Sequence, residues 1–260
     1  METLLKYPRT SHIQGSRCQT GDENLANEPF TVIADRYLVI EEKVDGANAA
    51  MSFDSQGQLL LQSRGHYLTG GHRERHFNLF KQWAACHQAA FWQILTDRYI
   101  LYGEWMYAKH TVFYDWLPHY FLEYDLFDRQ QQIFLSTAAR QHVLQGLPLC
   151  SVPILYQGEL QKYAQLIKLL DRSHFIRPGH LERLRVSCLE QQINPDLAIA
   201  QTNPSELMEG LYIKVETADQ TVARYKYVRP DFLNTILDSE THWLNRPIVP
   251  NQLQTQTNLF

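Results

Sequence analysis

A run of apolar and β-branched residues, Tyr37–Lys43, ends on a lysine that is followed by Asp45 and Gly46. Its composition predicts a β-strand, and Gly46 ends it because glycine suits turns and lets a ligand approach the backbone. Residues 49–53 and Leu59–Ser63 flank a turn-forming segment and are predicted as two further strands. This block therefore favours a β-sheet that presents a lysine and a carboxylate at the end of one strand.

A second strand-rich block extends over residues 211–228. Alternation along a strand places two sets of side chains on opposite faces, with Leu211, Ile213 and Val215 on one face and Tyr212, Lys214 and Glu216 on the other. Arg224 and Lys226 are two positions apart, so both cations are expected on the same side of one strand. Residues 100–106 and 119–127 are predicted as further strands between the two blocks.

Apolar residues recur every three or four positions within residues 77–95, 160–170 and 181–189, which predicts helices. The last two fall in a segment of about residues 136–205, which we interpret as a helical insert. The tail from residue 247 is rich in Gln, Asn and Thr, and we expect it to be loosely ordered or docked on the core. Because no internal repeat or linker is evident, one α+β domain is the simplest organisation.

Composition excludes several classes of protein. Hydrophobic residues make up 44% of the chain and charged residues 20%, which is typical of a folded globular protein and not of a disordered one. No apolar run approaches the roughly 18 residues of a membrane helix, and the N-terminus lacks a signal-peptide core. The four cysteines are scattered without a Cys-x-x-Cys pair, so neither a disulfide framework nor a zinc site is indicated. We therefore expect a cytoplasmic protein with no membrane partner.

The formal net charge of −4 argues against a protein that coats nucleic acid non-specifically, because such binding depends on many phosphate contacts. The net charge does not exclude an enzyme that acts on nucleic acid, since a local basic groove is sufficient to bind its substrate. Cations gather near the motifs described below, namely Arg64, Arg73, Arg75, Arg224, Lys226 and Arg229. Charge alone therefore does not decide between the classes.

Lys43 suits covalent nucleotide chemistry. An amine that attacks phosphorus must be neutral, and the free pKa of lysine is about 10.4, so burial or nearby positive charge must lower it. Lys226, Arg224 and a magnesium ion are the predicted sources of that charge. Asp45 shares strand parity with Lys43 and is expected to orient the amine or to assist a later hydroxyl attack. The alternative is a surface Lys–Asp pair at a strand end, and this short motif does not exclude it by itself.

Further motifs follow Lys43 along the chain. They are, in order, Glu-Glu-Lys-Val-Asp-Gly-Ala-Asn at 41–48, Ser-Arg-Gly at 63–65, Tyr-Gly-Glu at 102–104, Glu-Tyr-Asp at 123–125, Glu-Gly-Leu-Tyr-Ile-Lys at 209–214 and Arg-Tyr-Lys at 224–226. This ordered series resembles the covalent nucleotidyltransferase superfamily of polynucleotide ligases and capping enzymes. The wording around Lys43 and the position of the insert are most similar to ATP-dependent RNA ligases.

The resemblance implies an α+β fold: a single nucleotidyltransferase (adenylyltransferase) domain of antiparallel sheets flanked by helices. It implies a core over residues 1–230, with the insert at about 136–205, and a short extension over 231–260. DNA ligases and capping enzymes add an OB-fold domain after the last motif. Only about 30 residues follow Lys226, too few for a five-stranded barrel, so no OB-fold domain is expected.

The resemblance also assigns roles to residues. It implies catalytic roles for Lys43, Asp45 and Lys226, and nucleotide contacts for Glu42, Lys43, Arg64, Glu104, Tyr124, Glu209, Lys214, Arg224 and Lys226. Glu104 corresponds to a contact with the ribose, Tyr124 to the aromatic ring that stacks on the purine, and Glu209 to a ligand of the metal. Arg224 departs from the lysine that is usual at its position, which makes Lys226 the stronger candidate for contacting the phosphates.

The implied reaction uses ATP and Mg2+, for which Mn2+ can substitute. Lys43 attacks ATP to form lysyl-AMP, AMP passes to an RNA 5′-phosphate, and a 3′-hydroxyl attacks the activated end to seal the strand. The partners are then RNA with 5′-phosphate and 3′-hydroxyl ends and an end-healing or RNA-clamping protein. Alternatives are DNA nick sealing, RNA 5′-adenylylation with a partner, or a non-catalytic module that binds RNA or nucleotide.

Overall fold

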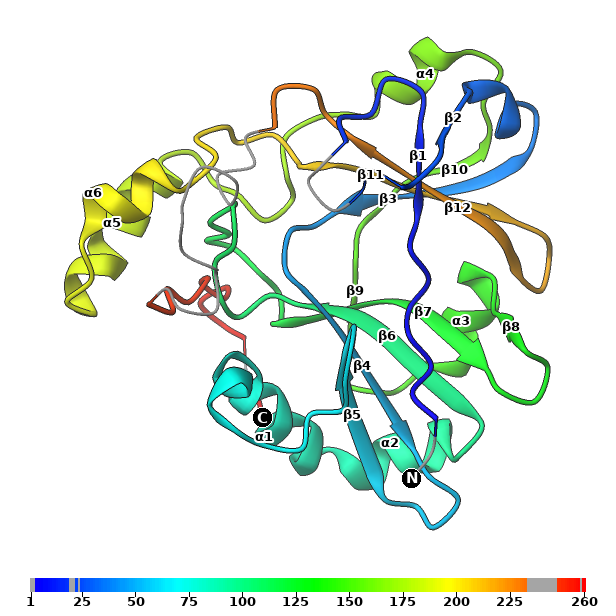
Figure 1. The fold of residues 1–260 in the computed structure, drawn as a ribbon, viewed down its shortest axis with the longest axis horizontal. Helices are drawn as coiled ribbons and strands as arrows, with labels where there is room; N and C mark the ends of the chain where they lie inside the picture. The colour runs from blue at the N-terminus through cyan, green and yellow to red at the C-terminus, as the bar shows by residue number, and fades with distance from the viewer. Residues whose placement is uncertain (1–2, 19–21, 23, 233–246, 258) are drawn as a thin grey trace.

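The computed structural model describes residues 3–18, 22, 24–232, 247–257 and 259–260. Two six-stranded sheets face each other (Figure 1). The first contains, in order across it, β10 (Ile154–Glu159), β3 (Tyr37–Lys43), β11 (Gly210–Glu216), β12 (Thr221–Val228), β1 (Ser11–Ile13) and β2 (Asn27–Glu28). The second contains β5 (Leu59–Ser63), β4 (Ala47–Phe53), β6 (Tyr99–Trp105), β7 (Phe121–Asp128) and β8 (Ile133–Phe134), and β9 (Cys150–Ser151) also pairs with β7.

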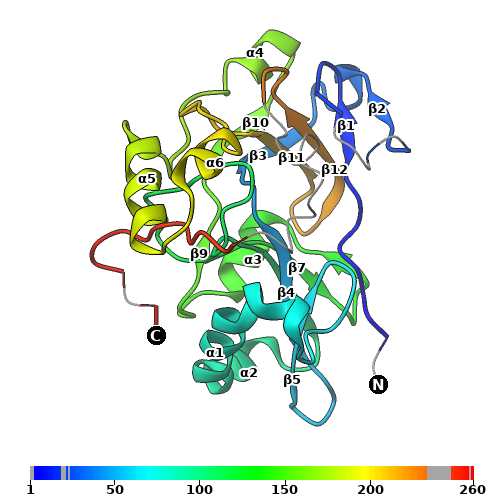
Figure 2. The same ribbon diagram turned by 60° about the vertical axis from the view of Figure 1, so that its left-hand side comes forward.

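Eight helices flank the sheets within the described part of the chain. They are the 3-10 helices η1 (Phe30–Val32) and η2 (His72–Phe77) and the α-helices α1 (Asn78–Cys86), α2 (Gln88–Leu95), α3 (Thr137–Val143), α4 (Tyr163–Ile167), α5 (His180–Glu190) and α6 (Pro195–Ala200). Helices α1 and α2 cover the second sheet, α4 lies beside the first, and α5 and α6 project together at one side (Figure 1; Figure 2). The two halves of the molecule therefore each consist of a sheet with its own helical cover.

The α+β class predicted from the sequence is confirmed, with three differences in detail. The central ladders are antiparallel, but β1 pairs in parallel with β12 and β2, and β9 pairs in parallel with β7. The helical pattern over residues 77–95 is interrupted at His87, which separates α1 from α2. Segment 136–205 holds α3 to α6 and also β9 and β10, and β10 pairs with β3. That segment is therefore only partly helical and completes one edge of the first sheet.

Each sheet buries one apolar face against its own cover. In the first sheet, Leu38 and Ile40 of β3 and Ile213 of β11 pack with Leu160 and Leu166 from the α4 region. A separate core joins the second sheet to the aromatic side chains of α1 and α2, among them Phe80, Trp83 and Phe91. Burial of such apolar area is the main stabilising contribution to folding. The remaining faces of the sheets, which carry many polar side chains, are turned toward each other.

The N-terminal segment connects both sheets (Figure 1). The carbonyl oxygen of Leu5 accepts hydrogen bonds of 2.9 Å from Tyr102 of β6 and Gln62 of β5, both in the second sheet. Farther along, β1 pairs with β12 in the first sheet. Of the two expectations for the tail, docking on the core is the one observed, since Asn251 is buried and Val249 packs beside α5. The rest of the expected extension, residues 233–246, lies outside the described residues.

The described residues contain no helix that is long and apolar enough to span a membrane. They also contain no five-stranded barrel besides the two sheets, as expected from the sequence.

Candidate active site

A cavity of about 1110 Å³ lies where the chain crosses from the first sheet to the second. The crossing is made by Val44, Asp45 and Gly46, between the end of β3 and the start of β4. A Cβ atom at Gly46 would lie 2.9 Å from the Trp105 carbonyl oxygen, so this close crossing requires glycine. Eight of the ten site residues predicted from the sequence line the cavity: Glu42, Lys43, Asp45, Arg64, Glu104, Tyr124, Glu209 and Lys226.

Lys43 is paired with Glu209 inside the cavity. The Nζ atom of Lys43 lies 2.6 Å from Oε2 of Glu209, because Gly210, at the start of β11, is in register with Lys43 on β3. Burial lowers the pKa of Lys43, but the carboxylates of Glu209, Asp45 and Glu104 outweigh burial and leave the pKa above its usual range. The expectation that positive charge around Lys43 lowers its pKa is therefore wrong for the ligand-free protein, in which Lys43 is protonated.

The loop of residues 111–112 fixes the carboxylate of Asp45. Its Oδ2 atom accepts hydrogen bonds from the backbone N–H groups of Thr111 at 2.7 Å and Val112 at 3.0 Å. The backbone N–H of Asp45 donates to the hydroxyl of Tyr114 at 2.9 Å. The other carboxylate oxygen of Asp45, Oδ1, lies 3.9 Å from Nδ1 of His110. Asp45 is thus held at the cavity wall beside Lys43, with a carboxylate whose position is set by backbone groups.

Glu104 lies on β6, where it is in register with Asn48 of β4. Burial raises the pKa of Glu104 to about 7, although Lys43 and Arg64 act in the opposite direction. Asp45 and Glu209 add to the increase because they are like charges. A carboxyl group that titrates near neutrality inside a cavity is characteristic of functional sites.

Aromatic side chains form one end of the cavity. The rings of Tyr124 on β7 and Tyr212 on β11 have centroids 6.2 Å apart and an interplanar angle of 35°. Tyr7 packs against Tyr124 with the ring centroids 5.3 Å apart, and its hydroxyl lies 2.6 Å from that of Tyr212. Asn48 donates a hydrogen bond to the hydroxyl of Tyr124. All four side chains line the cavity, so this end presents aromatic faces that suit a planar base.

Another part of the cavity wall carries Lys226 of β12. Its Nζ atom lies 2.5 Å from Oδ2 of Asp22, which also lines the cavity. Burial lowers the pKa of Lys226, and Asp22 only partly compensates. Asp22 was not predicted from the sequence, nor were Tyr7 and Tyr212. Tyr212 shares strand parity with Lys214, which is the local signal that could have indicated it, and no comparable local pattern marks Tyr7 or Asp22.

Lys214 and Arg224 do not line the cavity, unlike the other predicted contacts. The ammonium of Lys214, which is fully buried, lies 2.9 Å from Glu41 and 3.2 Å from Asp125, and it donates to the Tyr124 carbonyl oxygen. The Nε atom of Arg224 lies 2.9 Å from Asp125, and the guanidinium stacks on Phe134 with 3.9 Å to the ring centroid. The prediction that these two cations contact the nucleotide is not supported by their positions.

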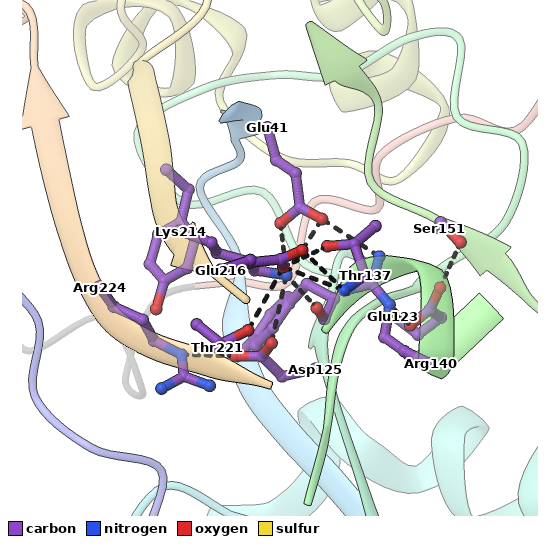
Figure 3. A network of polar contacts seen from close by, with 12 residues as sticks. Glu41, Glu123, Asp125, Thr137, Arg140, Ser151, Lys214, Glu216, Thr221 and Arg224 are labelled. Carbon is purple, nitrogen blue, oxygen red and sulfur yellow. Dashed lines mark hydrogen bonds and ion pairs between the residues drawn. The ribbon is translucent and has the colours of Figure 1, made fainter. Parts of the chain in front are cut away.

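These two cations belong to a buried ionic network between the sheets (Figure 3). Arg140 of α3 extends it, with 3.1 Å to Glu41 and 3.3 Å to Glu123. Despite burial, the cations Arg224, Lys214 and Arg140 hold the pKa of Asp125 well below its usual range. The ammonium of Lys214 on β11 is therefore paired with carboxylates from β3 and β7. Since β3 and β7 belong to different sheets, these ion pairs connect the two sheets.

Glu42 lines the cavity but uses its carboxylate elsewhere. It accepts hydrogen bonds from the Ser173 hydroxyl at 2.5 Å and from the backbone N–H of His174 at 3.1 Å, and it lies 2.8 Å from the His174 imidazole. This pairing raises the pKa of His174. Glu42 therefore joins β3 to the segment before α5. It lines the cavity, but its carboxylate is held by Ser173 and His174.

The donor set of the cavity fits a hard divalent cation. Oxygen ligands are available from Glu209, Glu104 and Asp45, all of which surround Lys43. Within the described ranges no group of three or more His, Cys, Asp or Glu side chains is arranged to hold a metal by itself. At a nucleotide site Mg2+ usually takes one or two carboxylates and completes its shell with water and phosphate, so Glu209 with one neighbouring carboxylate is a sufficient set of protein ligands.

A family model described as RNA ligase matches residues 36–228. No curated protein matches the sequence. Among solved structures, an archaeal ATP-dependent RNA ligase is 13% identical with a TM-score of 0.53, and the match covers 86% of this chain and 48% of that one. A Naegleria gruberi RNA ligase variant with ATP and Mn is 15% identical with a TM-score of 0.53, covering 81% and 54%.

Another Naegleria gruberi RNA ligase variant, with AMP and Mn, is 16% identical with a TM-score of 0.52, covering 91% of this chain and 66% of that one. The present chain thus spans about half to two thirds of the length of these solved chains. At these identities the likeness concerns the fold, and the match to the family model covers the strands that carry every motif from Lys43 to Lys226.

Proposed function

Because the chain belongs to the RNA ligase family, we propose that it is an ATP-dependent RNA ligase that joins 5′-phosphate and 3′-hydroxyl ends. One observation carries this proposal: Lys43 lies in a cavity of about 1110 Å³ with its Nζ atom 2.6 Å from Glu209. Aromatic rings lie at one end of the same cavity and Lys226 on another part of its wall. A nucleophile, a carboxylate, a base platform and a cation are the groups that adenylyl transfer requires.

In the first step, Lys43 attacks the α-phosphorus of ATP. The bond between Nζ and phosphorus forms, the bond from the α-phosphorus to the bridging oxygen breaks, and pyrophosphate leaves. The amine must lose its proton, and the carboxylates around it oppose that loss in the ligand-free protein. A Mg2+ ion held by Glu209 would offset this negative charge and that of the phosphates.

The remaining residues position the nucleotide. We assign the purine to the exposed faces of the Tyr124 and Tyr212 rings, and the ribose to Glu104, whose charge acts on both Lys43 and Tyr124. Lys226 and Arg64 are assigned to the phosphates, since cations placed where charge develops stabilise the transition state. Asp45 orients Lys43 and is available to assist the later attack of a 3′-hydroxyl. These assignments use seven residues that line one cavity.

In the second step AMP passes from Lys43 to an RNA 5′-phosphate, and in the third a 3′-hydroxyl attacks that phosphate and AMP leaves. Use of ATP and the four free cysteines fit a cytoplasmic enzyme. An end-healing or RNA-clamping protein is proposed as the partner that holds the strands.

The test is incubation with α-labelled ATP and Mg2+ or Mn2+, followed by denaturing electrophoresis. The wild type should retain label, Lys43→Ala should retain none, and the exposed Lys168→Ala should match the wild type. An unlabelled wild type, or label on Lys43→Ala, would contradict the proposal and favour a non-catalytic binding module. Nicked duplexes with RNA or DNA 3′-hydroxyl ends then separate RNA ligation from DNA nick sealing, and accumulation of adenylylated RNA would indicate a 5′-adenylyltransferase.

A further inference from the structure

Lys226 is held by residues of the N-terminal segment, which lies outside the range matched by the family model. Strand β1 pairs in parallel with β12, and in that register His12 is opposite Lys226. The carboxylate of Asp22 lies 2.5 Å from Nζ of Lys226, and both side chains are largely buried, 12% and 13% exposed. Burial restricts how far the carboxylate and the ammonium can move apart.

A chain of hydrogen bonds fixes Asp22 in turn. Nε2 of His12 lies 3.0 Å from the same Oδ2 atom, and His12 is fully buried. Nδ1 of His12 lies 2.7 Å from the hydroxyl of Ser16, and that hydroxyl accepts a hydrogen bond of 2.9 Å from the Val228 backbone N–H. The series Val228, Ser16, His12, Asp22, Lys226 is therefore continuous, and it begins and ends on β12.

The donors and acceptors of this series match with one tautomer of His12. Burial lowers the pKa of His12, which favours the neutral imidazole. If Nε2 carries the proton, it donates to Asp22, and Nδ1 accepts from the Ser16 hydroxyl, which itself accepts from Val228. Both ring nitrogens of His12 and the Ser16 hydroxyl then have partners, as buried polar groups require. The other tautomer would place an unprotonated nitrogen against a carboxylate.

We propose that Asp22 and His12 are positioning residues that hold the ammonium of Lys226 toward the phosphates of ATP. The inference rests on the proposed ligase function and adds two residues to it. Lys226 has three N–H donors and Asp22 engages Nζ from one side, which leaves donors for the cavity. A lysine side chain is flexible, so it stabilises the transition state more strongly when a partner has already fixed the position of its ammonium group.

The test is a double-mutant cycle on the rate of lysyl-AMP formation, using Asp22→Asn, Lys226→Ala and the double variant. Asp22→Asn should lower the maximum rate by roughly ten- to hundredfold, with little change in the apparent KM for ATP. In the Lys226→Ala background, Asp22→Asn should lower the rate by less than about threefold, because the ammonium group that Asp22 positions is no longer present. Asp196→Asn, in the exposed α6, should match the wild type.

His12→Leu is the second variant, since leucine has a similar volume but can neither accept from Ser16 nor donate to Asp22. It should lower the maximum rate in the same direction as Asp22→Asn, with little change in the apparent KM for ATP. Equal losses for Asp22→Asn with and without Lys226, or an Asp22→Asn rate at or above that of the wild type, would overturn the proposal. Failure of the wild type itself to form lysyl-AMP would instead refute the proposed function.

Discussion

The Nζ atom of Lys43 lies 2.6 Å from Oε2 of Glu209, although 166 positions separate the two residues in the chain. The pairing of β3 with β11 brings them together, and it places the proposed nucleophile in contact with the proposed metal ligand. The same carboxylate that would hold a cation therefore also raises the pKa of Lys43.

Glu209→Gln is expected to lower the rate of lysyl-AMP formation by about a hundredfold or more, because an amide holds a divalent cation poorly and the charge on the phosphates stays uncompensated. Labelling with α-labelled ATP over a range of Mg2+ concentrations measures this effect. Glu182→Gln, on the exposed surface of α5, is the matched control and should leave the rate unchanged. A Glu209→Gln rate near that of the wild type would remove Glu209 from the metal site.

The raised pKa of Glu104 predicts that stability depends on pH. Its pKa is about 7 in the folded protein and 4.5 for the free side chain, so the folded state binds more protons between these values. Its contribution to stability is complete below pH 4.5 and is lost as the pH rises through 7. At about 1.4 kcal/mol per pKa unit, and allowing for partial solvent exposure, the loss is on the order of 2 kcal/mol.

Urea unfolding at pH 5 and pH 8 measures this loss, with Glu104→Gln as the reference because an amide does not titrate. The wild type should lose stability relative to Glu104→Gln between the two pH values. Parallel behaviour of the two proteins would show that the pKa of Glu104 is close to its usual value.

Lys214→Met should destabilise the fold and leave nucleotide binding intact. Removing the ammonium leaves the buried carboxylates of Glu41 and Asp125 without this counter-charge. Loss of one partner of a buried ion pair typically lowers the free energy of unfolding by about 3–5 kcal/mol. Lys168→Met, at an exposed position, should change the free energy of unfolding by less than about 0.5 kcal/mol. Urea unfolding gives both values. A rise of about tenfold in the apparent KM for ATP with unchanged stability would make Lys214 a nucleotide contact after all.

Tyr124→Ala should raise the apparent KM for ATP by about tenfold to hundredfold, since stacking on a base contributes roughly 1–3 kcal/mol. Tyr212→Ala should act in the same direction because its ring faces that of Tyr124. Tyr124→Phe keeps the ring and loses only the hydroxyl that accepts from Asn48, so it should remain close to the wild type. If the phenylalanine variant is as impaired as the alanine variant, the hydroxyl and not the ring is the important group.

Local sequence determined much of the fold. Strands β3 and β5 have the bounds that their composition predicts, and the apolar set Leu211, Ile213 and Val215 faces the core as alternation requires. A strand's faces are fixed by its own backbone, so such patterns can be read without knowledge of the rest of the chain. The position of Lys43 at a strand end before Gly46 is likewise a local property.

Tertiary structure alone decided what each polar face meets. Parity put Lys214 opposite the apolar face of β11, but only the second sheet shows that Glu41 and Asp125, and not a nucleotide, occupy the space before it. Asp22 contacts Lys226 from 204 positions away, and His12, which holds Asp22, lies on a three-residue parallel strand too short to recognise in the sequence. Alternation fixes the direction of a side chain, whereas its partner, and therefore its charge state and role, depends on long-range packing that no local pattern encodes.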